Sequence, residues 1–191
     1  MRTNRRKLMF LAKNKTIPVE FKRLRYVQNI KDAYINTGII CQYDKKYKAS
    51  FETSVAENSG VWLGANLFLR CKYDINKIGN TVAYILIQDN SVIDMSWEYP
   101  FATIKVNEES NTANWKGYCE NKDFPFGIFS FGDGSNGFVR CKIYWLKIFC
   151  ENVLIRDYVP VKRIKDGIIG MYDLVEKKFY QSSTKTSLTG A

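Results

Sequence analysis

The feature that most constrains the fold is a series of short segments in which apolar and polar side chains alternate. The clearest case is residues 47–55 (YKASFETSV). Successive side chains of a strand point to opposite faces, so this segment predicts a strand with one buried and one solvated face. Residues 138–150 (FVRCKIYWLKIFC) are apolar on both faces, which is typical of a central sandwich strand. A turn at Glu151-Asn152 then predicts that residues 153–161 return antiparallel.

Other short runs predict further strands, and helical periodicity is almost absent. The predicted strands are 61–63, 67–69, 81–88, 91–99, 101–106, 126–131, 168–173 and 178–181, with an early strand that holds Tyr34, Ile35 and Ile39. We expect a polar loop over 107–123 and a polar tail over 182–191, and the one helix candidate is 5–12. About ten short strands at this spacing predict an all-β fold, a two-sheet antiparallel sandwich or jelly roll.

Composition limits the chemistry open to this fold. The 191 residues suffice for one core, and 15% of them are aromatic, which favours strands. Histidine is absent, which excludes a Ser-His-Asp or Cys-His catalytic centre and a His-ligated zinc. The five cysteines have irregular spacings and no Cys-x-x-Cys, so we interpret them as small buried residues of a protein made in a reducing cytoplasm. We therefore predict no catalytic, cofactor or metal site.

The net charge of +10 is concentrated near the N-terminus. Residues 1–25 hold nine basic residues and one acid, whereas residues 26–191 hold twenty basic residues and eighteen acids. We therefore divide the chain into a basic N-terminal arm, 1–25, and a nearly neutral sandwich domain, 26–191. Such an arm is typical of a segment that binds an acidic surface. The candidate anchoring residues are Arg2, Arg5, Arg6, Lys7, Lys13 and Lys15.

We favour an arm that docks on a neighbouring protein. A solvated tail is the plain alternative, and nucleic acid is disfavoured because the arm has one aromatic residue, Phe10, and no binding motif. The apolar stretch 8–12 is too short for an export signal, and no run approaches the length that crosses a bilayer. We expect no membrane span.

Three stretches in order carry a resemblance to a known family. They are residues 26–39 (YVQNIKDAYINTGI), 142–161 (KIYWLKIFCENVLIRDYVPV) and 166–180 (DGIIGMYDLVEKKFY). Together they resemble the concanavalin A-like lectin/glucanase module of phage and prophage structural proteins. The sequence departs from the family pattern at Asn36, where the family has aspartate, and at Glu151-Asn152, where the family turn has a glycine. Residues 56–125 match by pattern alone.

The resemblance implies a virion structural protein, such as a head fibre, a decoration protein or a tail appendage. Its arm would dock on other virion proteins, its sandwich would project outward, and a homo-oligomer is expected. Motif residues such as Arg156, Asp157, Tyr172 and Asp173 are interpreted as structural, with hydrogen bonds from Tyr172-Asp173 closing the sandwich end.

Two functional alternatives stay open. A receptor-binding lectin module would use exposed aromatic rings on host-surface polysaccharide, and the candidates are Trp97, Tyr99, Trp115 and Tyr118. The favoured interpretation of these rings is that they cap the ends of the core. A glycan-cleaving enzyme would need two carboxylates about 5–9.5 Å apart. The best pair on one strand, Asp94 and Glu98, is separated by about 13 Å, so hydrolysis is disfavoured.

Overall fold

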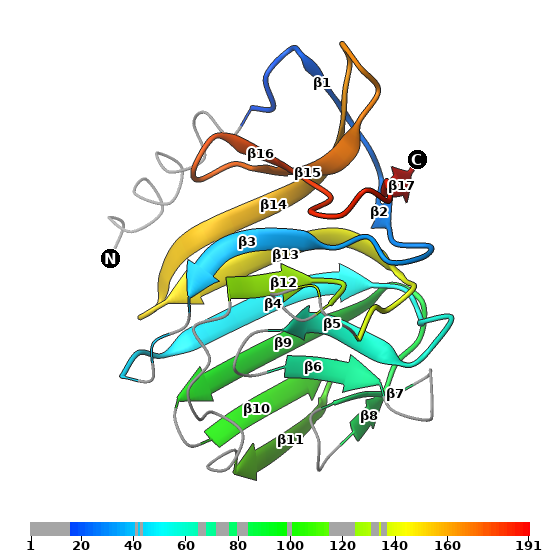
Figure 1. The fold of residues 1–191 in the computed structure, drawn as a ribbon. Helices are drawn as coiled ribbons and strands as arrows, with labels where there is room; N and C mark the ends of the chain where they lie inside the picture. The colour runs from blue at the N-terminus through cyan, green and yellow to red at the C-terminus, as the bar shows by residue number, and fades with distance from the viewer. Residues whose placement is uncertain are drawn as a thin grey trace, which may run out of the picture.

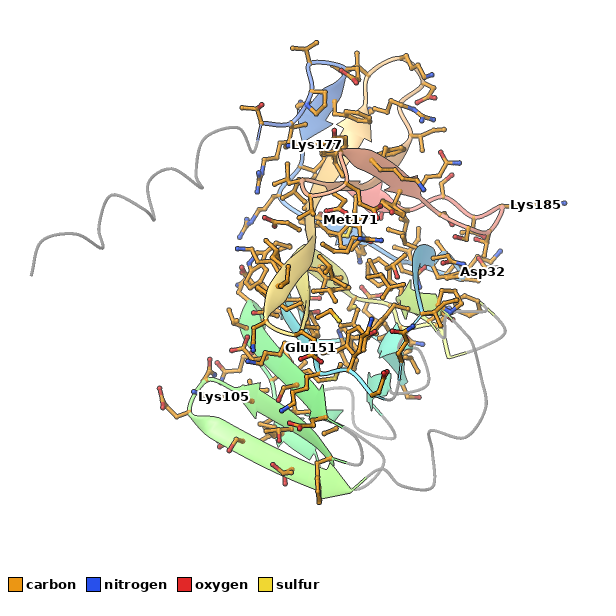
Figure 2. All side chains as sticks on the ribbon, turned by 90° about the vertical axis from the view of Figure 1, so that its left-hand side faces the viewer. Asp32, Lys105, Glu151, Met171, Lys177 and Lys185 are labelled. Carbon is orange, nitrogen blue, oxygen red and sulfur yellow. The ribbon has the colours of Figure 1, made fainter. Side chains whose placement is uncertain are left out.

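A computed structural model describes residues 16–40, 42, 44–64, 68–71, 77–79, 84–98, 101–114, 125–130, 134 and 137–191. Within these ranges the chain is all β, with no helix, and its strands form two antiparallel sheets (Figure 1). The predicted fold class is therefore confirmed at the level of an all-β, sandwich-like architecture. The helix candidate at 5–12 lies outside the described residues.

The larger sheet has eleven strands. They are β1 (Phe21–Arg23), β2 (Val27–Gln28), β4 (Tyr47–Thr53), β9 (Ser91–Glu98), β10 (Phe101–Val106), β11 (Glu109–Asn114), β13 (Lys142–Cys150), β14 (Val153–Arg163), β15 (Ile169–Asp173), β16 (Lys178–Gln181) and β17 (Thr189–Gly190). The main path runs β11-β10-β9-β4-β13-β14-β15-β16. Along β4, buried and more exposed residues alternate from Tyr47 to Thr53, as the sequence pattern predicts.

The smaller sheet has six strands and lies in front of the larger one in Figure 1. They are β3 (Ile35–Ile40), β5 (Gly60–Gly64), β6 (Phe68–Cys71), β7 (Lys77–Gly79), β8 (Tyr84–Leu86) and β12 (Pro125–Ile128). A hydrophobic core fills the space between the sheets, with Phe51 from β4, Trp62 from β5 and Phe126 from β12 fully buried. Trp62 keeps its indole N–H satisfied by donating to Thr53 Oγ1.

The hairpin between β13 and β14 shows how the chain turns at Glu151-Asn152, where the family that the sequence resembles has a glycine. Glu151 and Asn152 both adopt positive φ, 49° and 64°, as a two-residue type I′ turn requires. Asparagine tolerates this conformation, whereas glutamate rarely does. The Glu151 side chain helps to hold the turn, because its Oε1 accepts the Lys46 N–H and its own N–H donates to the Lys46 carbonyl.

Two predicted irregular segments contain strands instead. The loop expected over 107–123 begins with β11, which pairs with β10 along its whole length after a turn at Asn107. The tail expected to be polar ends in β17, which pairs with β2, and Leu188 just before it is buried. Both segments are polar in sequence, so their structure comes from pairing with a neighbour rather than from an apolar pattern of their own.

Candidate functional site

Most residues predicted to have a function lie outside the described residues. This holds for the six arm candidates and for Tyr99, Trp115 and Tyr118. Trp97 belongs to β9, where the register places it opposite Tyr47 of β4 and Ala102 of β10. Both of these neighbours are buried. The predicted aromatic glycan site therefore stays a prediction.

The last residues of the predicted arm are attached to the larger sheet. Ile17 and Phe21 pack on a second hydrophobic cluster, formed by Val159, Val161, Tyr172 and Leu174. The Phe21 ring lies 5.2 Å from that of Tyr172 and 5.1 Å from that of Phe179, measured between ring centroids. Ile17 and Phe21 therefore hold the last part of the predicted arm on the larger sheet.

Backbone pairing continues this attachment along the chain. β1 pairs with the outer end of β14, with Lys22 opposite Lys162. The Leu24 N–H donates to the Pro160 carbonyl at 2.9 Å, and β2 then pairs with the start of β13. The segment from β1 to β2 thus fills the space where β13 and β14 diverge, and it stands at the upper end of the molecule in Figure 1.

A separate candidate site is an open groove of about 480 Å³ on the larger sheet. Its polar lining comes from Lys48, Ser50, Asp94, Ser96, Thr103, Lys105 and Asn152, and Phe149 adds an aromatic surface. These residues share the solvent face because β4, β9 and β10 bury the alternate positions, such as Ala49, Met95 and Ile104. The volume lies within the range typical of small-ligand sites.

Cross-strand register explains how the groove is assembled. Asp94 lies opposite Ser50 on one side and Lys105 on the other, so a carboxylate stands between a hydroxyl and a cation. At one end, Lys48 Nζ donates to Asn152 Oδ1 at 2.8 Å. Because this arrangement depends on pairing of the β9–β10 hairpin with β4, which is distant in sequence, the alternation pattern alone did not reveal it.

The two carboxylates compared in the sequence analysis, Asp94 and Glu98, both lie on β9. Glu98 does not line the groove, and its Oε1 forms a 2.7 Å ion pair with Lys46 Nζ. This partner raises the pKa of Lys46. The register brings Glu52 diagonal to Asp94, which corresponds to a separation of about 7–8 Å. Glu52 Oε2, however, accepts the Trp145 indole N–H at 2.8 Å. Asp94 is the one acid that lines the described groove.

The motif residues near the C-terminus meet in a buried polar cluster. Asp173 is fully buried, and its Oδ1 accepts N–H groups of Asp157 and Val175 at 2.9 Å each. Its Oδ2 lies 3.5 Å from Arg156 Nε, and Arg156 Nη2 also pairs with Glu176 Oε1 at 2.6 Å. The expected hydrogen-bonding role of Asp173 is confirmed.

Two tyrosines complete this cluster. The Tyr180 hydroxyl donates to Glu176 Oε2, and its ring meets that of Tyr158 edge-on at 5.4 Å. Burial, then the Glu176 carboxylate, raises the pKa of Tyr180 to about 12. Burial also raises the pKa of Tyr158. Both tyrosines therefore stay protonated at neutral pH and above the ordinary pKa of a tyrosine.

Sequence comparisons add no family assignment, because neither protein-family models nor curated proteins match this chain. Across the described residues, no three His, Cys, Asp or Glu side chains gather closely enough to hold a metal ion. In that same part of the chain, no helix has the length and apolarity needed to cross a bilayer. Cys141 is buried in the core and Cys150 packs against it.

Proposed function

We propose that this chain is a structural protein of a bacteriophage particle. In this proposal a concanavalin A-like jelly roll projects from the virion, and the basic leader, residues 1–15, docks on neighbouring virion proteins. The assignment to a phage rests on three stretches of the sequence that resemble the module of phage structural proteins and follow in the same order. Copies of the chain are expected to act together as a homo-oligomer on the particle.

The observation that carries the proposal is the way the leader joins the body. It holds six bases and no acid, and it is followed in the chain by Ile17 and Phe21, which are partly buried where they pack on the second hydrophobic cluster. A charged segment that leaves a rigid sandwich from a fixed point is suited to anchoring, because docking it also orients the domain. A solubility tail would gain nothing from this attachment.

Removal of residues 1–15 tests the proposal while sparing the packed segment. We expect the truncated chain to keep its thermal unfolding midpoint and to be lost from particles purified after infection. A matched variant keeps the leader length but replaces its six bases with glutamine, and it should be lost as well. If the truncated chain still copurifies with particles at the wild-type level, the anchoring role is wrong.

The groove on β4, β9 and β10 favours one second function, the binding of a host-surface glycan. Hydroxyl and carboxylate groups beside an aromatic ring are groups that bind sugars, and Ser50, Asp94 and Phe149 supply them. Asn152 adds a side-chain amide. Asp94→Asn and Phe149→Ala should abolish signal on a glycan array, whereas Lys185→Ala, which changes an exposed residue outside the groove, should not. An array without signal for the wild-type chain would exclude this second function.

A further inference from the structure

We propose that the end of the sandwich from which the leader starts is itself a docking surface for an acidic protein of the particle. This leader-exit surface comprises residues 16–23 and 162–168. The inference rests on the proposed function and adds to it, because it assigns part of the attachment to the folded body.

Two exposed apolar residues mark the surface. Val19 is 93% exposed and Ile164 is 62% exposed. The Ile164 N–H donates to the Glu20 carbonyl at 2.9 Å, so the two segments lie side by side. Ile168, on the same hairpin as Ile164, is also exposed. Isolated exposed apolar residues are ordinary, but several on one small surface are characteristic of interaction sites.

Local structure does not account for these residues. Val19 occupies a turn closed by the Phe21 N–H and the Pro18 carbonyl at 3.0 Å, and Ile164 lies in the turn between β14 and β15. Turns favour Gly, Asn, Asp and Ser, whereas β-branched residues belong in strands. Val19 and Ile164 therefore serve neither the conformation of their turns nor the core, which leaves contact with a partner as their use.

Both turns are rigid, which lowers the entropic cost of binding. Val19 lies between Ile17 and Phe21, whose side chains pack on the second cluster. In the hairpin, the Arg163 N–H donates to the Ile168 carbonyl at 2.8 Å, and Arg163 Nε contacts both Asp166 carboxylate oxygens at 3.0 Å. The exposed side chains are thus presented in one arrangement before any partner binds.

The charges identify the kind of partner. The leader-exit surface holds five bases (Lys22, Arg23, Lys162, Arg163 and Lys165) and two acids (Glu20 and Asp166). Lys22 lies directly opposite Lys162 in the β1–β14 pair, an arrangement of like charges that destabilises a sheet. An acidic partner would relieve this repulsion. Exposed valine and isoleucine favour a protein over nucleic acid, whose phosphates gain nothing from apolar contact.

The test compares full-length chains in sedimentation with particles assembled without this protein. The double variant Val19→Ser/Ile164→Ser should bind at least about tenfold more weakly, as loss of apolar anchors at an interface does. The matched control is Val153→Ser, because Val153 is 64% exposed but belongs to the opposite end of β14. This control should bind within about twofold of wild type, and the unfolding midpoints of all three chains should agree.

The outcomes separate the two proposals. A wild-type chain that does not sediment with particles would refute the proposed function and this inference together. If deletion of residues 1–15 abolishes binding while the double variant binds like wild type, the proposed function stands and the inference fails. Binding of the chain that lacks residues 1–15 to a duplex DNA as tightly as to particles would assign the surface to nucleic acid and overturn the inference.

Discussion

Two Arg–Asp pairs in this protein allow the effect of burial to be separated from the effect of distance. The pair between Arg156 and Asp173 is buried, and its atoms are 3.5 Å apart. The pair between Arg163 and Asp166 is shorter, at 2.8 Å, but exposed. If distance alone decided how much each pair stabilises the fold, loss of the Asp166 charge would lower the free energy of unfolding more than loss of the Asp173 charge. We predict the opposite, because solvent screens the exposed pair.

The perturbation is Asp173→Asn, which removes the charge and keeps the shape. The amide oxygen still accepts the two N–H groups that Oδ1 accepts now, so the main loss is the partner of Arg156. Removing one member of a buried pair costs about 3–5 kcal/mol. Arg156 keeps Glu176 at 2.6 Å, and its side chain is 15% exposed, so the lower end of that range, about 3 kcal/mol, is expected.

The assay is urea denaturation followed by tryptophan fluorescence, for which the buried Trp62 is a reporter. A loss of about 3 kcal/mol corresponds to a fall in the urea midpoint of roughly 1–2 M. The control Asp166→Asn keeps an oxygen for the Ile168 N–H and should leave the midpoint unchanged within error. Equal midpoints for the two variants, or a loss below about 1 kcal/mol for Asp173→Asn, would refute the argument from burial.

Three further predictions follow from other contacts. In Gly170→Ala the new Cβ would overlap the Tyr180 carbonyl oxygen, so the free energy of unfolding should fall by about 3 kcal/mol. The control Gly38→Ala, where the new Cβ has open space and only the φ of 71° opposes it, should cost about 1 kcal/mol. The pKa of Tyr180 is raised to about 12 from an ordinary value of 10, so the contribution of this group to the free energy of unfolding is fully present below pH 10 and is lost as the pH rises through 12. The urea midpoint should therefore be lower at pH 11 than at pH 8, and this difference should be smaller in Tyr180→Phe. Lys22→Glu should raise the melting temperature by about 1–2 °C by removing the repulsion from Lys162, yet weaken sedimentation with particles; a variant that loses both stability and binding would contradict this.

Strands with their own apolar pattern were predictable from the sequence. The segments 101–106 and 178–181 match β10 and β16 residue for residue, and the 47–55 pattern gives β4 with the expected buried face. Their side chains determine which face is buried without reference to a partner. The strands β1 and β11 are not predictable this way, because they form by pairing with β14 and β10.

The groove shows the same limit for functional residues. Analysis of one strand at a time compared Asp94 with Glu98, two positions on β9, and rejected them as a catalytic pair because about 13 Å separates them. The register places Asp94 between Ser50 and Lys105. Glu98 forms an ion pair with Lys46. No local pattern encodes which residue of β4 lies opposite which residue of β9. The residues that line the groove could therefore be identified only from the pairing of the strands in the sheet.

At the leader-exit surface, two residue types do not match the local structure in which they lie. In most of the chain, local preference and tertiary position agree: the Gly167 turn has a φ of 74°, and the Asp166 side chain accepts the Ile168 N–H. Val19 and Ile164 break this agreement, since each places a strand-forming side chain at an exposed turn. Natural proteins accept such local conflicts mainly where function requires them. The conflict is visible only once the turns and their exposure are known, which is why it escaped the sequence pattern and why it points to a partner.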